Sequence, residues 1–166
     1  MSGSDAPPRR TRKAPARSAR PGPVSWAGLP GGALVVVDTA PIIYLLEDHP
    51  LFLERFIGLF EAEAAGQLHI AISTITLAEV LTGPLRTGQA ALAQRYEKAL
   101  ARFTIVPVCS AVAVLAAGMR ARYGLKLPDA LQLATALEIG AVALVTHDRD
   151  FARVEGLDIL RGSEPA

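Results

Sequence analysis

Five short apolar runs alternate with segments of helical periodicity along most of the chain. The runs cover residues 33–37, 68–72, 104–108, 142–145 and 157–160. The run at 142–145 is apolar throughout, as expected of a parallel strand that is covered on both faces. Strands that alternate with helices indicate βαβ units, so the pattern predicts an α/β fold around a parallel sheet.

Amphipathic spacing and turn-forming residues locate the helices between these runs. Large apolar side chains recur at helical spacing over residues 52–60 and predict one amphipathic helix. Gly83-Pro84 is predicted to break the helix that follows the second run. Pro128 suits the first position of a later helix, and Gly140 suits its left-handed end.

Composition indicates one folded domain with an aliphatic core, preceded by a basic segment. The 166 residues are 51% hydrophobic but only 5% aromatic. Residues 1–32 lack apolar periodicity and are rich in Pro, Ala, Arg, Ser and Gly, so we predict a disordered extension there and one domain over residues 33–163. Residues 1–20 carry six basic groups against one acidic group. This segment is either a salt-sensitive arm for phosphate groups or, as we favour, a solvated extension without a role.

Several classes of protein do not fit the sequence. No apolar run reaches the roughly 18 residues of a membrane span. The single cysteine, Cys109, rules out an intrachain disulfide, and its apolar neighbours predict a core position. Neither GxxxxGKS/T nor GxGxxG occurs, so nucleotide-cradling loops are not supported. We therefore expect a cytoplasmic protein without membrane contact.

Four carboxylates are predicted to reach the same edge of the sheet. Asp38 and Asp148 follow the first and fourth strands, Glu79 lies in the predicted first turn of the helix after the second strand, and Asp129 opens the helix before the fourth. Ligands bind beyond the carboxyl ends of strands in open parallel sheets. The topology therefore directs these four acids to one rim.

Three of the four acids also have a purely structural interpretation. Thr76 to Glu79 matches a capping box, Asp129 can complement the helix dipole, and Asp148 suits a turn. Their joint occurrence favours chemistry, because two carboxylates roughly 4 Å apart repel by about 4 kcal/mol at an effective dielectric of about 20. All-oxygen ligation suits Mg²⁺ or Mn²⁺, and such a metal could polarise a phosphate and activate a water.

The segments that carry these acids resemble PIN-domain ribonucleases, specifically the VapC-type toxins of bacterial type II toxin–antitoxin pairs. The resemblance rests on VVVDTAPIIYLL, ISTITLAEVLTGPLR, YGLKLPDALQLATAL and LVTHDRDF. It covers nearly everything from residue 33 to about residue 161. It implies a PIN-like three-layer α/β/α sandwich with a central parallel sheet of four to five strands.

The resemblance also implies a site and a reaction. In that family, the acids that match Asp38, Glu79, Asp129 and Asp148 form the Mg²⁺ pocket of an endoribonuclease, in which Mn²⁺ is expected to substitute. A metal-activated water would attack an RNA phosphodiester in line, with Glu79 as a ligand or as the group that orients the water. By the family pattern, Asp150 is peripheral.

Other side chains around the pocket are assigned by the same resemblance. Thr39 and Thr146 are expected to donate hydrogen bonds within it, and His147 stands where the family commonly has Asn. RNA phosphates need basic contacts near an acidic pocket, and the candidates are Arg120, Arg122 and Lys126. Three other basic residues are expected to form a solvated helix face, namely Arg95, Lys98 and Arg102.

Partners follow from the family as well. The resemblance implies an RNA substrate, a homodimer and a VapB-type antitoxin that covers the pocket with a basic side chain. Apolar side chains of the first helix and of residues 52–60 either line a groove for the antitoxin or, as we favour for most of them, pack in the core.

Two other functions remain open from the sequence. An aspartyl-phosphate phosphatase would use Asp38 as nucleophile, but such a site needs a second aspartate two positions on, where Ala40 stands. A non-catalytic PIN-like module that binds RNA or protein is the other alternative, and the complete set of four acids argues against it.

Overall fold

The computed structural model describes residue 26 and residues 28–162 of the chain. Within them, one parallel sheet has the strand order β3-β2-β1-β4-β5. Its strands are β1 (Ala33–Val37), β2 (Leu68–Ser73), β3 (Thr104–Val106), β4 (Ala143–Thr146) and β5 (Asp158–Arg161). All five lie within one or two residues of the predicted runs, and the α/β fold is confirmed.

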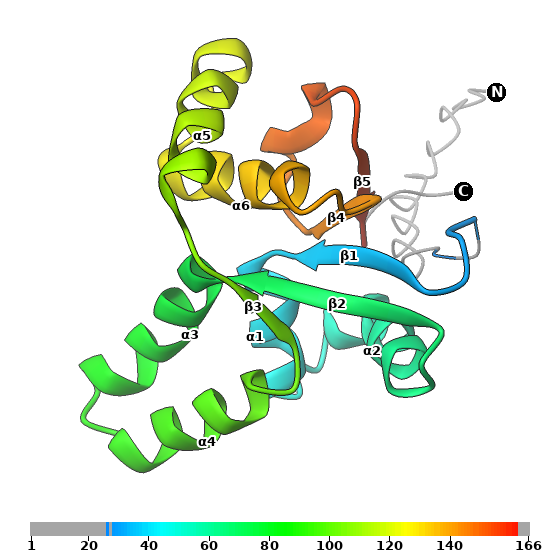
Figure 1. Cartoon of the computed structure of the whole chain (residues 1–166). Helices are drawn as coiled ribbons and strands as arrows, with labels where there is room; N and C mark the ends of the chain where they lie inside the picture. The colour runs from blue at the N-terminus through cyan, green and yellow to red at the C-terminus, as the bar shows by residue number, and fades with distance from the viewer. Residues whose placement is uncertain (1–25, 27, 163–166) are drawn as a thin grey trace, which may run out of the picture.

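Helices cover both faces of this sheet and make three layers (Figure 1). The α-helices are α1 (Thr39–Leu46), α2 (Ile57–Ala64), α3 (Thr74–Arg86), α4 (Ala90–Leu100), α5 (Ser110–Tyr123) and α6 (Leu127–Glu138). Two 3₁₀ turns are η1 (Leu53–Arg55) and η2 (Asp150–Arg153). Figure 1 shows α5 and α6 on one side of the sheet and α1 to α4 on the other, which confirms the predicted three-layer α/β/α sandwich.

Alternation along the central strand divides the core in two. Val35 and Val37 of β1 pack with side chains of α1, α2, α3 and α4, whereas Val36 points to the opposite face and packs with α5 and α6. Successive side chains of a strand point to opposite faces, so each face carries its own apolar cluster. Three of the six large apolar side chains of residues 52–60 are core residues, namely Phe56, Leu59 and Phe60, and the other three are half-buried.

The order of the strands creates a switch point at the carboxyl end of β1. In the sheet, β2 lies on one side of β1 and β4 lies on the other. The connections that leave the carboxyl ends of β1 and β4 therefore run in opposite directions. The Asp38 N–H donates to the Val145 carbonyl at 2.9 Å, which ties the ends of β1 and β4 together. Open parallel sheets bind ligands at such points.

Two helix predictions were wrong. Residues 52–60 form η1 and the start of α2 instead of one helix, because Phe52 stacks on His49 with ring centroids 4.8 Å apart and stays outside α2. Gly83-Pro84 does not break α3, which continues to Arg86. Pro84 is buried within the last turn of α3, where burial of its ring offsets the hydrogen bond that it cannot donate.

The start and end of α6 follow the predicted signals closely. Pro128 is the second residue of the helix instead of the first, because Leu127 begins it. Gly140 follows the helix in the left-handed region, with φ of 65°. Both residues therefore fix the orientation of α6, which carries Asp129 in its first turn.

Most of the predicted disordered extension, residues 1–25 and 27, lies outside the described residues, and the domain boundary at residue 33 stays a prediction. Trp26 and Leu29 pack against the cluster formed with α1 to α4. The Gly32 N–H donates to the Gln67 carbonyl at 2.8 Å. Contacts with the folded domain thus begin before residue 33. Among the described residues, no helix is long and apolar enough to cross a bilayer.

Candidate metal centre

The four predicted acids line one pocket of about 460 Å³ at the switch point. Asp38 is the N-cap of α1 directly after β1, and Asp148 follows β4. Glu79 comes from α3 and Asp129 from the first turn of α6. Thr39, Ala40, Ile43 and Thr82 complete the lining. Acids from four separate segments of the chain therefore meet in one pocket, as the predicted topology required.

Asp38 is the most deeply buried of these acids and is held by two hydrogen bonds. Its Oδ1 accepts from the Thr39 N–H and its Oδ2 from the Thr146 hydroxyl, both at 2.7 Å. Burial raises the pKa of Asp38 above its usual value despite these bonds, and the charges on Glu79 and Asp148 raise it further. The predicted role of Thr146 as a hydrogen-bond donor in the pocket is confirmed.

Asp129 contributes an oxygen, Oδ2, that is buried and has no hydrogen-bond donor among the described residues. Burial, followed by the charges on Asp148 and Asp38, raises the pKa of Asp129 to about 6. A buried carboxylate oxygen without a donor is costly unless it is protonated or bound to a cation. The position therefore fits a metal ligand better than a group that merely complements a helix dipole.

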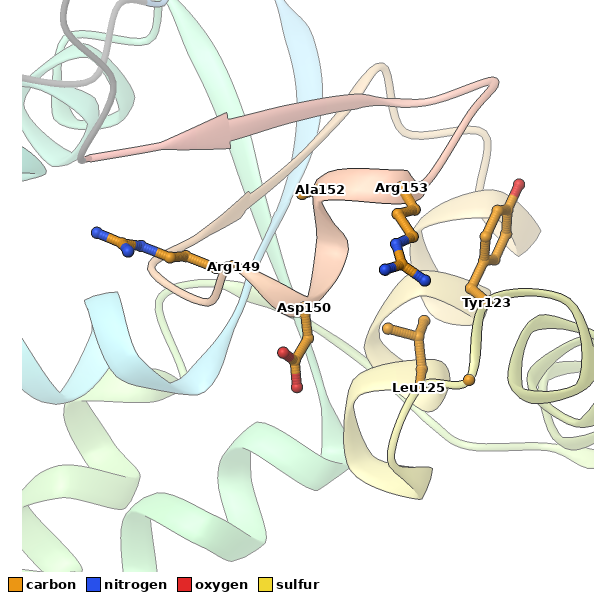
Figure 2. A pocket seen from close by; sticks show the side chains of 7 residues that line it. Tyr123, Leu125, Arg149, Asp150, Ala152 and Arg153 are labelled. Atoms are coloured by element: carbon orange, nitrogen blue, oxygen red, sulfur yellow. The ribbon is translucent and has the colours of Figure 1, made fainter.

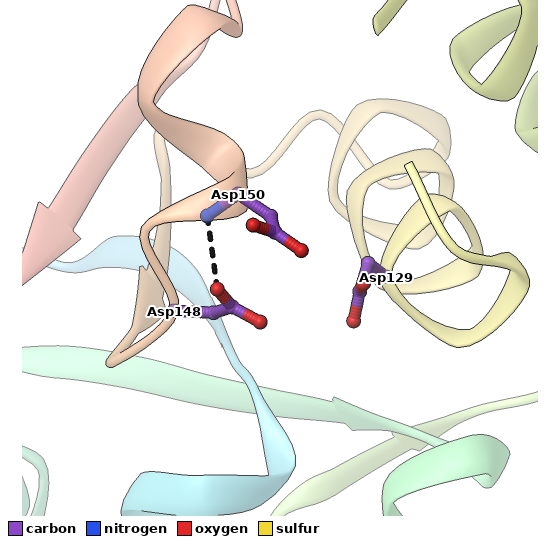
Figure 3. A group of neighbouring side chains, drawn as sticks. All are labelled: Asp129, Asp148 and Asp150. Carbon is purple, nitrogen blue, oxygen red and sulfur yellow. Dashed lines mark hydrogen bonds between the residues drawn. The ribbon is translucent and has the colours of Figure 1, made fainter. Parts of the chain in front are cut away.

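Asp148 and Asp150 form a short turn beside Asp129 (Figure 3). The Asp150 N–H donates to Asp148 Oδ1 at 2.9 Å, and the Asp148 N–H donates to the Thr146 hydroxyl at 3.0 Å. Asp129, Asp148 and Asp150 each offer one carboxylate oxygen, all within 4.8 Å of one another. All-oxygen groups of this kind suit a hard divalent cation. Asp150 thus belongs to the acidic cluster, whereas the family pattern had made it peripheral.

Glu79 is positioned by a buried network instead of a capping box. Ser73 is the N-cap of α3, and its hydroxyl accepts from the Thr76 N–H at 3.2 Å. Glu79 therefore lies in the second turn, and its Oε2 accepts from the Thr39 hydroxyl. The capping-box interpretation was wrong because β2 runs one residue further than predicted and Ser73 begins the helix.

Gln132 is a site residue that sequence reasoning missed. It is 1% exposed on α6, and its Nε2 donates to Thr76 Oγ1 at 2.7 Å and to Thr39 Oγ1 at 3.3 Å. Its Oε1 accepts from the Ser73 hydroxyl at 2.8 Å. The available signal was one amide inside the apolar run of α6, because a buried polar group needs partners. Gln132 couples α6 to the helices that carry Asp38 and Glu79.

His147 joins the acidic turn to Tyr44 of α1 and Arg55 of η1. Its Nδ1 lies 2.7 Å from the Tyr44 hydroxyl and its Nε2 lies 3.3 Å from Arg55 Nη1. Arg55 only donates, so Nε2 accepts and the imidazole is neutral. Burial and then the charges on Arg55 and Arg149 lower the pKa of His147. The residue before Asp148 is therefore fixed on both sides.

The predicted phosphate contacts are engaged in other interactions. Arg120 donates from Nε to the Leu125 carbonyl at 3.3 Å. Arg122 pairs with Glu155 at 3.1 Å and Lys126 with Asp150 at 3.3 Å. Both pairs are exposed, and such pairs contribute little to stability.

Known proteins share this architecture. The model of the PIN domain family matches residues 35–157. A toxin–antitoxin complex from Klebsiella pneumoniae includes a chain with 31% identity and a TM-score of 0.62, covering 79% of this chain and 99% of that one. VapBC2 from Rickettsia felis, bound to a promoter DNA fragment, has 22% identity and a TM-score of 0.62, with 76% and 96% covered. VapC20 from Mycobacterium tuberculosis, a sarcin-ricin loop cleaving toxin, has 18% identity and a TM-score of 0.57, with 76% and 98% covered. No curated protein sequence matches the chain.

The fold and the pocket define a parallel α/β protein with an acid-lined site that can hold a hard divalent cation. Because the family model spans most of the chain, the chain belongs to the PIN-domain family. The resemblance to VapC-type proteins found in the sequence is thereby confirmed, and family membership supports a nuclease role.

Proposed function

We propose that this protein is a Mg²⁺-dependent endoribonuclease and the toxin of a type II toxin–antitoxin pair. The observation that carries the proposal is the buried Oδ2 of Asp129, which has no hydrogen-bond partner in the described part of the chain and lies in a pocket that three other carboxylates line. Such a donor set suits Mg²⁺, with Mn²⁺ as a substitute. The RNA-cleaving toxin among the structural neighbours supports RNA as the substrate class.

Each side chain has a defined task in this proposal. Asp38, Asp129 and Asp148 hold the metal, which when bound would polarise the scissile phosphate and lower the pKa of a water. Glu79 ligates or orients that water, and the Thr39 hydroxyl fixes its Oε2. The two hydrogen bonds to Asp38 keep its oxygens oriented toward the pocket without reorganisation.

Cleavage of RNA tests the catalytic part of the proposal. We expect the purified protein to cleave RNA with Mg²⁺ or Mn²⁺ and to stop with chelator. Asp129→Asn should lower the rate by about a hundredfold or more, because it removes a charged metal ligand. Asp158→Asn, an exposed acid on β5, is the matched control and should keep the rate. Cleavage that persists in chelator, or full activity in Asp129→Asn, would contradict the mechanism; RNA binding without cleavage would favour a non-catalytic module.

The proposed partner is a VapB-type antitoxin, and the proposed assembly of the toxin is a homodimer. The solved neighbours include VapBC complexes, two of them with DNA. An antitoxin that covers the acidic pocket with a basic side chain would block the substrate. Co-purification with the product of a small reading frame directly upstream, together with inhibited cleavage, is the expected result. A product that binds elsewhere and leaves cleavage unchanged would contradict this part.

A further inference from the structure

A second pocket, of about 440 Å³, adjoins the acidic cluster on the side of η2. Its lining consists of Tyr123, Gly124, Leu125, Arg149, Asp150, Ala152 and Arg153. Figure 2 shows the Arg153 side chain reaching toward Leu125 and Asp150, while Arg149 extends away from them. Asp150 also belongs to the cluster with Asp129 and Asp148, which line the first pocket, so the two pockets are neighbours.

Two arginines line this pocket, Arg149 and Arg153, and of the two it is Arg153 that reaches toward Leu125 and Asp150 (Figure 2). Arg122 and Lys126 have carboxylate partners, Glu155 and Asp150. Arg153 is exposed and makes no ion pair or hydrogen bond with any residue that the structure describes. Because Lys126 already compensates Asp150, the Arg153 guanidinium keeps its donors available for an outside anion.

We propose that this pocket binds a backbone phosphate of single-stranded RNA, next to the phosphodiester held at the acidic pocket, with Arg153 as the phosphate ligand. The proposal rests on the proposed RNA substrate. An acid-lined pocket repels a polyanion, so an RNA strand needs a cation close to the acids but outside them. The planar guanidinium fork can take a phosphate through two hydrogen bonds. The Tyr123 ring forms the wall against which the attached sugar or base packs.

Binding measured without cleavage tests the proposal. Anisotropy of a labelled single-stranded RNA is followed in chelator at several salt concentrations, for wild type, Arg153→Ala, Arg153→Lys and Arg95→Ala. Arg95 is exposed on α4, which Figure 1 shows away from η2, so its variant removes the same charge elsewhere. We expect Arg153→Ala to weaken binding about tenfold, as loss of a charge-assisted bond does. The slope of log K against log salt should fall by about 0.7, the value for one lost phosphate contact on a single strand. Arg153→Lys should keep the slope and recover part of the affinity.

The outcomes separate this proposal from its alternatives. If Arg153→Ala binds RNA as Arg95→Ala does, the phosphate site is wrong even where the wild type cleaves RNA. If wild type shows the Arg153 dependence but no cleavage in Mg²⁺, the site stands and the proposed nuclease fails. Inorganic phosphate and a nucleoside monophosphate serve as competitors. Displacement of the RNA by either one at a concentration equal to that of the RNA would identify a site for a free phosphate and overturn the strand-binding proposal.

Discussion

The Asp129 carboxylate lowers the stability of the metal-free fold and is also a proposed metal ligand. Its Oδ2 is buried without a donor, and the pKa of its carboxyl is raised to about 6, first by burial and then by Asp148 and Asp38. Without a metal, ionisation of Asp129 therefore lowers the stability of the folded state at neutral pH. No hydrogen bond to Asp129 would be lost among the described residues if an amide replaced the carboxyl.

Asp129→Asn should therefore stabilise the metal-free protein. A folded-state pKa above the unfolded value of about 3.9 means that stability is retained below pH 3.9 and lost as pH rises through about 6. After a discount for partial exposure, we expect a gain of about 1 kcal/mol at about pH 8 that disappears near about pH 4. Urea unfolding in chelator measures this gain. An Asn variant that is less stable than wild type at the higher pH would contradict the account.

Prediction of single residues succeeded where chain order alone positions a group. Asp38 follows β1 directly and Asp148 follows β4 after one residue, so the sheet edge they reach follows from topology. Cys109 was predicted in the core but is exposed, because β3 ends at Val106 and Cys109 caps α5 at the surface. Gln132 was missed because its partners come from two other helices, and only the tertiary structure brings those together.

At the scale of elements, α2 meets the segment that precedes β1. A Cβ atom added to Gly58 of α2 would lie 2.0 Å from Cη2 of Trp26, so the indole packs directly on the glycine. Trp26 also joins the apolar cluster on that face of the sheet. A side chain at position 58 and the indole therefore compete for the same space.

The effect of Gly58→Ala on the free energy of unfolding should have opposite signs with and without the Trp26 indole. In wild type it should destabilise by about 1–2 kcal/mol, because the indole must leave its site. In a Trp26→Ala background it should stabilise by about 0.4–1 kcal/mol, because alanine reduces the entropy of the unfolded chain. A double-mutant cycle of urea unfolding measures the coupling. Equal effects in both backgrounds would show that the indole does not occupy this position in solution.

Helix boundaries proved harder to predict than the strands. Pro84 and Gly83 are strong local breakers, yet burial of the proline ring lets α3 continue to Arg86. The aromatic spacing over residues 52–60 fits one helix, but Phe52 packs on His49 and starts a 3₁₀ turn. In both places a tertiary contact outweighs the local preference, and that contact cannot be read from periodicity.

At the scale of the whole molecule, the parallel sheet explains why the order of strands and helices in the sequence predicts that the four acids reach one edge. Buried strands with alternating helices leave few topologies, and the switch point at β1 brings four distant segments to one edge. The part that could not be predicted is the second pocket, which Arg153 lines, and its position next to the acidic cluster. It depends on the side-chain orientations of η2, which has no periodic signal of its own.

Metal binding should stabilise the whole domain and should depend on pH through the acidic cluster. A ligand that binds only the folded state adds about 2.7 kcal/mol at a hundred times its Kd. For a domain of this size that is a rise of about 5–10 °C in Tm. We expect this rise with Mg²⁺ at about pH 8, measured by thermal unfolding against NaCl of equal ionic strength, which corrects for screening.

The same titration distinguishes specific ligation from general charge neutralisation. Protons compete with Mg²⁺ at Asp129 as pH falls through about 6, so the rise in Tm should fade across that range in wild type. Asp129→Asn lacks the titrating ligand, so its smaller rise should show no step near that pH. A rise of equal size above and below the step, or one that NaCl reproduces, would mean that the acids attract cations without forming a metal site. The difference between wild type and Asp129→Asn therefore reports the ligand itself, because both proteins share every other charge in the pocket.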